Sequence, residues 1–142
     1  MKMVAVVQVN LIVANLARSR EFYERLGVAF IPRNRHGAGP AEAWVSVDTG
    51  ISVVLHSTGF ASWWDESEPQ PSPGGPQMDF ELDSPAQLDA VVDGLRVDGV
   101  VVLKTPADMP WGQRFAIVCD PDGHRVGLKA ALATVNEQRG LV

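Results

Sequence analysis

Hydrophobic residues recur along the chain in two patterns, one with the period of a strand and one with the period of a helix. Residues 4–13 are rich in β-branched residues, and Gln8 and Asn10 stand two positions apart, as in a strand with one polar face. Asn15 follows as a helix cap and Gly27 as a helix stop. The helical period between them is carried by Leu16, Phe22, Tyr23 and Leu26. The first part of the chain therefore predicts a strand followed by a helix.

Three short strands are expected after this helix. Residues 28–31 form the first of them. Residues 43–47 and 51–57 then alternate on either side of a turn at residues 48–50. This completes the order strand, helix and three strands.

The second half begins with a strand and a helix as well. Residues 77–82 alternate, with Gln77, Asp79 and Glu81 on one face and apolar residues on the other. The segment Ser84-Pro85-Ala86-Gln87 is a capping box with proline at the first helical position, and it opens a helix that continues to about residue 97.

A hairpin is expected near the end of the chain. Residues 100–103 are predicted as a strand and residues 105–112 as a loop. The turn signal Asp-Pro-Asp-Gly at residues 120–123 lies between apolar runs at residues 115–119 and 126–128. The order strand, helix and three strands therefore occurs twice, which indicates an internal repeat.

A segment of different composition separates the two halves. Residues 59–76 contain four prolines, three glycines and the pair Trp63-Trp64, with no periodicity, so we expect a linker or long loop. The two tryptophans either pack under this loop or face a ligand or partner. The predicted organisation is a first module at residues 1–58, the linker at 59–76, a second module at 77–129 and a tail at 130–142.

Composition restricts the classes of function. Hydrophobic residues make up 46% of the 142 residues and charged residues 20%, which is typical of a globular protein. A formal net charge of −5 with 12 scattered Lys and Arg disfavours a nucleic-acid partner. Cys119 is the one cysteine, so no intrachain disulfide can form. Without a signal-peptide core or a membrane-spanning run, we expect a cytoplasmic protein that does not enter a membrane.

Two motifs resemble one protein superfamily. Trp-Gly-Gln-Arg-Phe at residues 111–115, then Asp-Pro-Asp-Gly and a short closing strand, are similar to the end of a module in the vicinal oxygen chelate superfamily, and residues 13–27 resemble its first helix. This superfamily includes glyoxalase I, extradiol dioxygenases and bleomycin resistance proteins. The resemblance implies an α+β fold in which two βαβββ modules form curled mixed sheets around a cavity.

The resemblance also implies four metal-ligand positions, and they fall on Gln8, Val54, Gln77 and Gly127. Valine and glycine cannot bind a metal, and catalytic metals normally take three ligands of the His, carboxylate or thiolate type. We therefore expect no metal and no cofactor. The alternative is one divalent metal ion with noncanonical ligands, such as His56 with Asp79 or Glu81 after a shift of register.

The inner faces of the predicted sheets instead suggest a ligand site without a metal. Carboxylates and amides would project into the cavity and aromatic rings would flank it, which suits a planar or cationic organic molecule. His56 could also be an interior histidine, Trp111 a core aromatic, and the carboxylates merely solvated. The candidate ligand-binding residues are Gln8, Asn10, His56, Trp63, Trp64, Gln77, Asp79, Glu81 and Trp111.

Three functions follow from these observations. The leading hypothesis is a homodimer that binds an organic small molecule without metal, as in the bleomycin-resistance branch, and that sequesters an antibiotic or another ligand in a groove between two chains. No catalytic residue is assigned. The second hypothesis is a metal-dependent lyase, isomerase or dioxygenase of the same superfamily. The third is a partner-binding protein that uses the Trp63-Trp64 loop as its interface.

Overall fold

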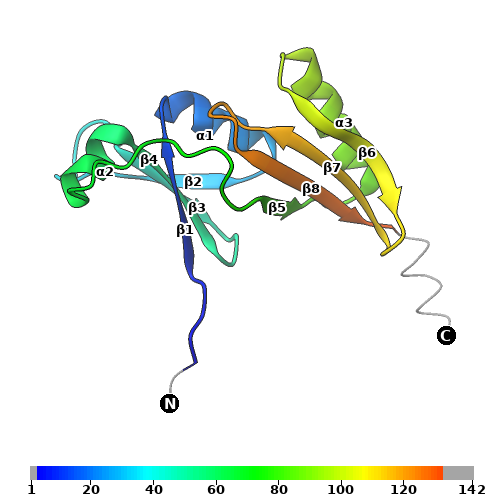
Figure 1. Cartoon of the computed structure of the whole chain (residues 1–142), viewed down its shortest axis with the longest axis horizontal. Coiled ribbons are helices and arrows are strands. Elements are labelled where there is room, and N and C mark those ends of the chain that lie inside the picture. The colour runs from blue at the N-terminus through cyan, green and yellow to red at the C-terminus, as the bar shows by residue number, and fades with distance from the viewer. Residues whose placement is uncertain (1–2, 133–142) are drawn as a thin grey trace. The chain divides into compact units, whose positions relative to one another are not determined.

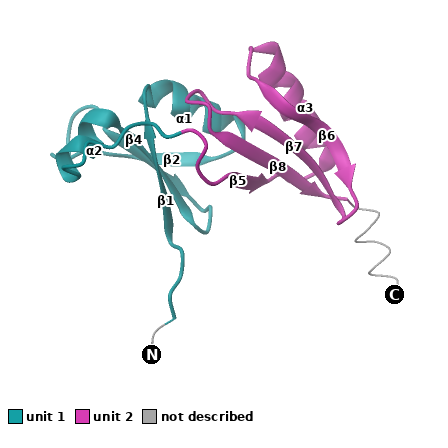
Figure 2. Cartoon of the chain, viewed as in Figure 1, with its two compact units in different colours: residues 1–72 teal, residues 73–142 magenta. Residues whose placement is uncertain are grey.

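The computed structural model describes residues 3–132, and the chain divides into two compact units between Ser72 and Pro73 (Figure 2). The last ten residues of the predicted tail lie outside the described part of the chain. Each unit contains one four-stranded sheet, and each is described by itself.

Unit 1 contains one sheet and two helices (Figure 1). Its strand order is β1-β4-β3-β2, with β1 parallel to β4 and the other neighbours antiparallel. In chain order its elements are β1 (Gln8–Val13), α1 (Leu16–Arg25), β2 (Ala29–Arg33), β3 (Ala43–Val47), β4 (Ser52–Ser57) and α2 (Thr58–Trp64).

Helix α1 covers one face of this sheet. It begins as predicted at Asn15, whose side chain accepts a hydrogen bond from the backbone N–H of Arg18 at 3.0 Å. Its own residues Phe22 and Tyr23 are buried, and Gly27 follows the end of the helix with φ 104°. The capped amphipathic helix therefore leaves the opposite face of the sheet available for other contacts.

Helix α2 packs against that opposite face. The strand register places Val45, Val54 and Asn10 side by side, and pairs Ala43 with His56, so these side chains share a face. Phe60 of α2 joins Ala43 and Val54 in a buried cluster. The prediction of a loop without regular structure from residue 59 is wrong here, because two helical turns are too short to show a period.

Unit 2 repeats the order of unit 1. Its strand order is β5-β8-β7-β6, with β5 parallel to β8. Helix α3 covers one face of this sheet (Figure 1), and its buried residues are Leu88, Val92 and Leu95. Ser84 caps the helix by accepting a hydrogen bond from the backbone N–H of Gln87 at 3.1 Å. The elements are β5 (Met78–Glu81), α3 (Pro85–Val97), β6 (Val102–Met109), β7 (Gln113–Cys119) and β8 (Arg125–Ala131).

The predicted α+β fold of two βαβββ modules is confirmed, with one correction in unit 2. The loop predicted at residues 105–112 is mostly strand, because β6 continues to Met109. Register shifts between Val102 and Lys104, and between Lys104 and Ala107, interrupt its pairing with β7. An irregularity of this kind disturbs the alternation from which a strand is recognised. Pro106 is tolerated because β6 is at the sheet edge.

Candidate functional site

A pocket of about 340 Å³ opens on the face of the unit 1 sheet that α1 does not cover. Strand β1 contributes two amides, the end of β2 an arginine, β4 a histidine, and α2 three aromatic rings. The lining residues are Gln8, Asn10, Arg33, His56, Phe60, Trp63 and Trp64. The parallel pairing of β1 with β4 and the packing of α2 therefore build this pocket from segments far apart in sequence.

The floor of the pocket is a chain of hydrogen bonds centred on Asn10. Its Oδ1 accepts from Gln8 Nε2 at 2.7 Å and lies 2.8 Å from His56 Nε2. Because an amide oxygen only accepts, His56 donates through Nε2–H in this arrangement. Its Nδ1 is then an acceptor, and this atom is buried without a hydrogen-bond partner in the described part of the chain.

His56 is held in its neutral form. The residue is 4% exposed. Burial lowers the pKa of His56, and the nearby charge of Arg33 lowers it further. The histidine therefore gives the pocket a hydrogen-bonding group and an apolar ring surface, without a positive charge at neutral pH.

The aromatic rings form a continuous wall beside His56. The centroid of the His56 ring lies 5.9 Å from Phe60 in a stacked arrangement and 5.2 Å from Trp64 edge to face. Phe60 stacks in turn on Trp63 at 5.7 Å. Phe60 is buried, whereas Trp63 is 58% exposed and Trp64 44% exposed. The buried phenylalanine thus anchors two tryptophans whose surfaces remain accessible.

Arg35 braces this wall from outside the pocket. Its guanidinium lies 5.1 Å from the Trp63 ring centroid and 5.9 Å from that of Phe60. Glu42 accepts from Arg35 Nε at 2.9 Å and from the Arg35 backbone N–H at 3.0 Å. These hydrogen bonds hold the pKa of Glu42 below its usual value. The loop between β2 and β3 is therefore tied to α2.

Five of the nine residues predicted from the sequence line this pocket together, namely Gln8, Asn10, His56, Trp63 and Trp64. The other four lie in unit 2: Gln77 directly precedes β5, Asp79 and Glu81 are on β5, and Trp111 is in the turn between β6 and β7. Trp111 is 63% exposed and is not a core aromatic. These four residues therefore belong to the second unit, whereas the pocket is lined by residues of the first.

Sequence reasoning missed two lining residues, Arg33 and Phe60. Phe60 stands three positions before Trp63, the spacing of one helix face, and this was the available signal. Arg33 carried no such signal, because only the pairing of β2 with β3 brings the end of β2 beside His56.

The four positions to which the resemblance assigns metal ligands carry residues that do not fit a metal. Val54 is fully buried in the apolar cluster under Phe60. At Gly127 a Cβ would overlap the carboxylate of Asp79 and lie 2.9 Å from Gln77 Nε2, so neighbouring side chains fill this place. Gln8 and Gln77 are neutral amides that already donate to Asn10 and Asp79. Two amides do not make a transition-metal site.

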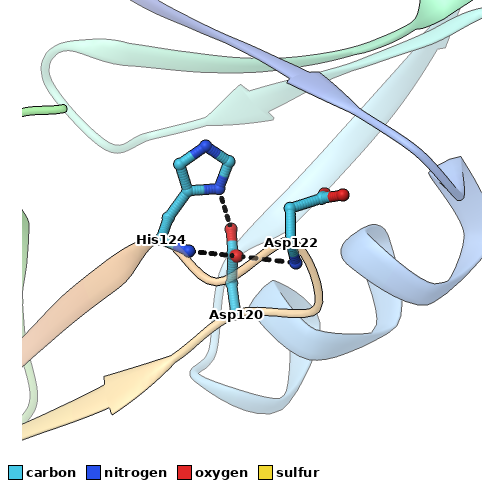
Figure 3. A group of neighbouring side chains, drawn as sticks. All are labelled: Asp120, Asp122 and His124. Atoms are coloured by element: carbon cyan, nitrogen blue, oxygen red, sulfur yellow. Dashed lines mark hydrogen bonds and ion pairs between the residues drawn. The ribbon is translucent and has the colours of Figure 1, made fainter. Parts of the chain in front are cut away.

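A second cluster of possible ligands, Asp120, Asp122 and His124, lies in the β7–β8 turn (Figure 3). Asp120 Oδ1 accepts from the backbone N–H groups of Asp122 and His124 at 2.9 Å each, and its Oδ2 lies 2.8 Å from His124 Nδ1. Asp120 is buried, and both of its oxygens are engaged by the turn. The cluster therefore has a structural role in closing the predicted hairpin, which is confirmed.

These features define a class of protein built from two βαβββ modules, each with a four-stranded mixed sheet. The chain belongs to the Glyoxalase/Bleomycin resistance protein/Dioxygenase superfamily, whose family model matches residues 5–128. A search of curated proteins gives no significant match. No helix within residues 3–132 is long and apolar enough to cross a membrane.

Solved structures of this superfamily share the fold. A family enzyme from Burkholderia phytofirmans is 14% identical with a TM-score of 0.72, over 91% of this chain and 100% of that one. A superfamily protein from Nocardioides is 22% identical with a TM-score of 0.65, over 93% and 86% of the two chains. A lactoylglutathione lyase from Agrobacterium tumefaciens is 18% identical with a TM-score of 0.63, over 89% and 92%.

Proposed function

We propose that this chain is a small-molecule-binding protein that takes an organic ligand into the pocket of unit 1 without a metal ion. The observation that carries the proposal is the aromatic wall of Phe60, Trp63 and Trp64 beside two surface amides and an arginine. Ligand sites in proteins combine apolar and aromatic walls with a few polar groups that fix orientation. This pocket has both components on one sheet face.

The half-exposed tryptophans support binding in particular. Large aromatic surfaces gain free energy when they leave water, and Trp63 and Trp64 retain exposed ring surface although Phe60 anchors their helix. A planar ligand that covers these rings would bury apolar area on both partners. Because the ring stack and the Arg35 contact already order the wall, little side-chain entropy remains to be lost on binding.

Binding without metal is supported by the chemistry of the available donors. The superfamily's ligand positions offer two amides, a buried valine and a glycine whose side-chain space Asp79 fills. Sequestration of an antibiotic or another organic compound by a homodimer is part of the same proposal. Metal analysis of protein purified without chelator should show far less than one equivalent of transition metal per chain. One equivalent that disappears in Gln8→Ala or Gln77→Ala protein would contradict the proposal.

The tryptophans themselves provide the binding test. In ¹⁵N-labelled protein the four indole N–H signals can be followed while planar organic compounds are added. Ligands of the pocket should move the signals of Trp63 and Trp64. Trp44, which lies under Arg20 at 4.3 Å on the other sheet face, and Trp111 in unit 2 serve as internal controls. A ligand that moves only Trp111 would place the binding site elsewhere.

A further inference from the structure

The charged and hydrogen-bonding groups of the unit 1 pocket are mainly donors. Arg33 is the one charged residue among those that line it. The part of the chain described by the structure offers its guanidinium no ion pair, and the side chain is exposed. Arg35, two residues further on, is by contrast bound by Glu42. The pocket thus carries one uncompensated positive charge beside its aromatic wall.

The amide of Asn10 adds further donors. Its oxygen is occupied by Gln8 and His56, and this fixes which end of the amide faces those residues. Its Nδ2 carries two N–H groups that have no hydrogen-bond partner within residues 3–132. Guanidinium and amide N–H groups are the usual partners of a carboxylate.

Carboxylates that would neutralise Arg33 are absent from the pocket lining. Glu42 is taken by Arg35, and Asp65, which follows α2, accepts from the N–H of Ser67 at 3.0 Å and from its hydroxyl at 2.7 Å. Asp79 and Glu81, which the sequence suggested as partners for a cationic ligand, belong to unit 2. The charge of the described lining therefore favours a negative ligand over a positive one.

Resting on the proposed function, we infer that the ligand class of this pocket is a planar aromatic compound that carries a carboxylate or a similar anionic group. Its ring lies against Trp63 and Trp64, and its anionic group is bound by Arg33 and by the N–H donors of Asn10. A cavity of about 340 Å³ suits one or two fused rings. Arg33 is then the residue that determines specificity for charge.

Three probes with the same ring and different charge test this inference: 1-naphthoate, 1-naphthalenemethanol and 1-naphthylmethylammonium. Each is titrated at neutral pH into the ¹⁵N-labelled full chain, and the Trp63 and Trp64 indole signals are followed. Naphthoate should bind about tenfold more tightly than the alcohol, which is the effect of one charge-assisted hydrogen-bonded pair, and the ammonium compound should bind most weakly.

Arg33→Gln provides the decisive comparison. This variant should lower naphthoate affinity about tenfold, to that of the alcohol, and should lower alcohol affinity much less, because only the anion forms a charge-assisted hydrogen bond with the guanidinium. Arg96→Gln, an exposed arginine on α3 in unit 2, is the matched control and should change neither. Unmoved Trp44 and Trp111 signals in both variants would show that the fold is intact.

The possible failures are distinct. If the three probes move the Trp63 and Trp64 signals with equal affinity, or the ammonium compound binds best, the anionic ligand class is wrong and the pocket itself stands. If naphthoate still binds about tenfold more tightly than the alcohol in Arg33→Gln, another residue determines the preference for an anion and the inference is overturned. If no probe moves either signal, the proposed function fails together with the inference.

Discussion

Replacement of Gly127 by alanine tests whether Asp79 occupies the place of the superfamily's last metal ligand. Gly127 is buried in β8, directly opposite Asp79 of β5, and its backbone is outside the left-handed region. An alanine Cβ would overlap the Asp79 carboxylate, but that carboxylate is the free end of an exposed side chain. We therefore expect Asp79 to rotate away while the strands stay in place.

The expected change in the free energy of unfolding of Gly127→Ala is the sum of two opposing contributions. Restricting the unfolded chain by a Gly→Ala change stabilises a protein by about 0.4–1 kcal/mol where the backbone permits it. Moving Asp79 breaks its 2.9 Å hydrogen bond with Gln77, which contributes about 0.5–1 kcal/mol at an exposed position. The free energy of unfolding of Gly127→Ala should therefore lie within about 1 kcal/mol of wild type.

A double-mutant cycle separates these contributions. In an Asp79→Ala background the carboxylate is absent and the exposed Gln77 side chain, no longer held by Asp79, can move away from the new Cβ. Gly127→Ala should then stabilise the protein by about 0.5–1 kcal/mol in urea unfolding. Gly59→Ala in α2, where an added Cβ meets nothing within 4 Å, is the control that measures the stabilisation of a Gly→Ala change without a steric obstacle. A cost above about 2 kcal/mol that is the same in both backgrounds would refute the reasoning, because the obstacle would then be something other than Asp79.

Three further changes test the pocket. Phe60→Ala should lower the free energy of unfolding by about 3 kcal/mol, and the indole N–H signals of Trp63 and Trp64 should move to a common position. Phe60→Leu should lower the free energy of unfolding by less than about 1.5 kcal/mol. A loss below about 1 kcal/mol for Phe60→Ala would mean that Phe60 does not anchor α2. Because the pKa of His56 is lowered, the free energy of unfolding of the wild type should fall as pH decreases below about 6.5, by at most about 1.4 kcal/mol per pH unit. His56→Gln should flatten this decline. If the free energy of unfolding of the two proteins falls in parallel with pH, the prediction is wrong. Glu42→Gln should be less stable than wild type above pH 4.5, because the variant lacks the ionised carboxylate that binds Arg35. Wild type loses this stabilisation as pH falls through the lowered pKa of Glu42, so the free energies of unfolding of the two proteins should become equal in acid. A difference that stays constant with pH would argue against the Arg35 contact.

The sequence predicts elements well wherever a local pattern and a cap coincide. Asn15 and Ser84 both accept from the N–H three residues later, as their positions suggested. Local patterns fail where the structure is short or irregular. Helix α2 has two turns and depends on the burial of Phe60, and β6 carries register shifts that obscure its alternation. Tertiary contacts decide both cases.

The candidate site was predictable only in part, for a related reason. Gln8, Asn10 and His56 could be assigned to inward strand faces from alternation. Arg33 could not, because its approach to the pocket depends on which strands become neighbours. The register of the sheet places Ala43 beside both Arg33 and His56, and no local signal specifies such a three-strand relation.

The two units share a structural detail at their paired first and last strands. In each, a glutamine donates to the residue two positions later: Gln8 to Asn10 at 2.7 Å, and Gln77 to Asp79 at 2.9 Å. In each, that second residue pairs with the last strand, Asn10 with Val54 and Asp79 with Gly127.

What covers the last strand differs between the units. In unit 2 the Asp79 side chain itself occupies the space beside Gly127. In unit 1 Val54 is larger than glycine and lies under Phe60. Helix α2, which carries Phe60, also brings Trp63 and Trp64 to this face. The same repeated strand pair therefore supports a filled surface in one unit and an aromatic pocket in the other.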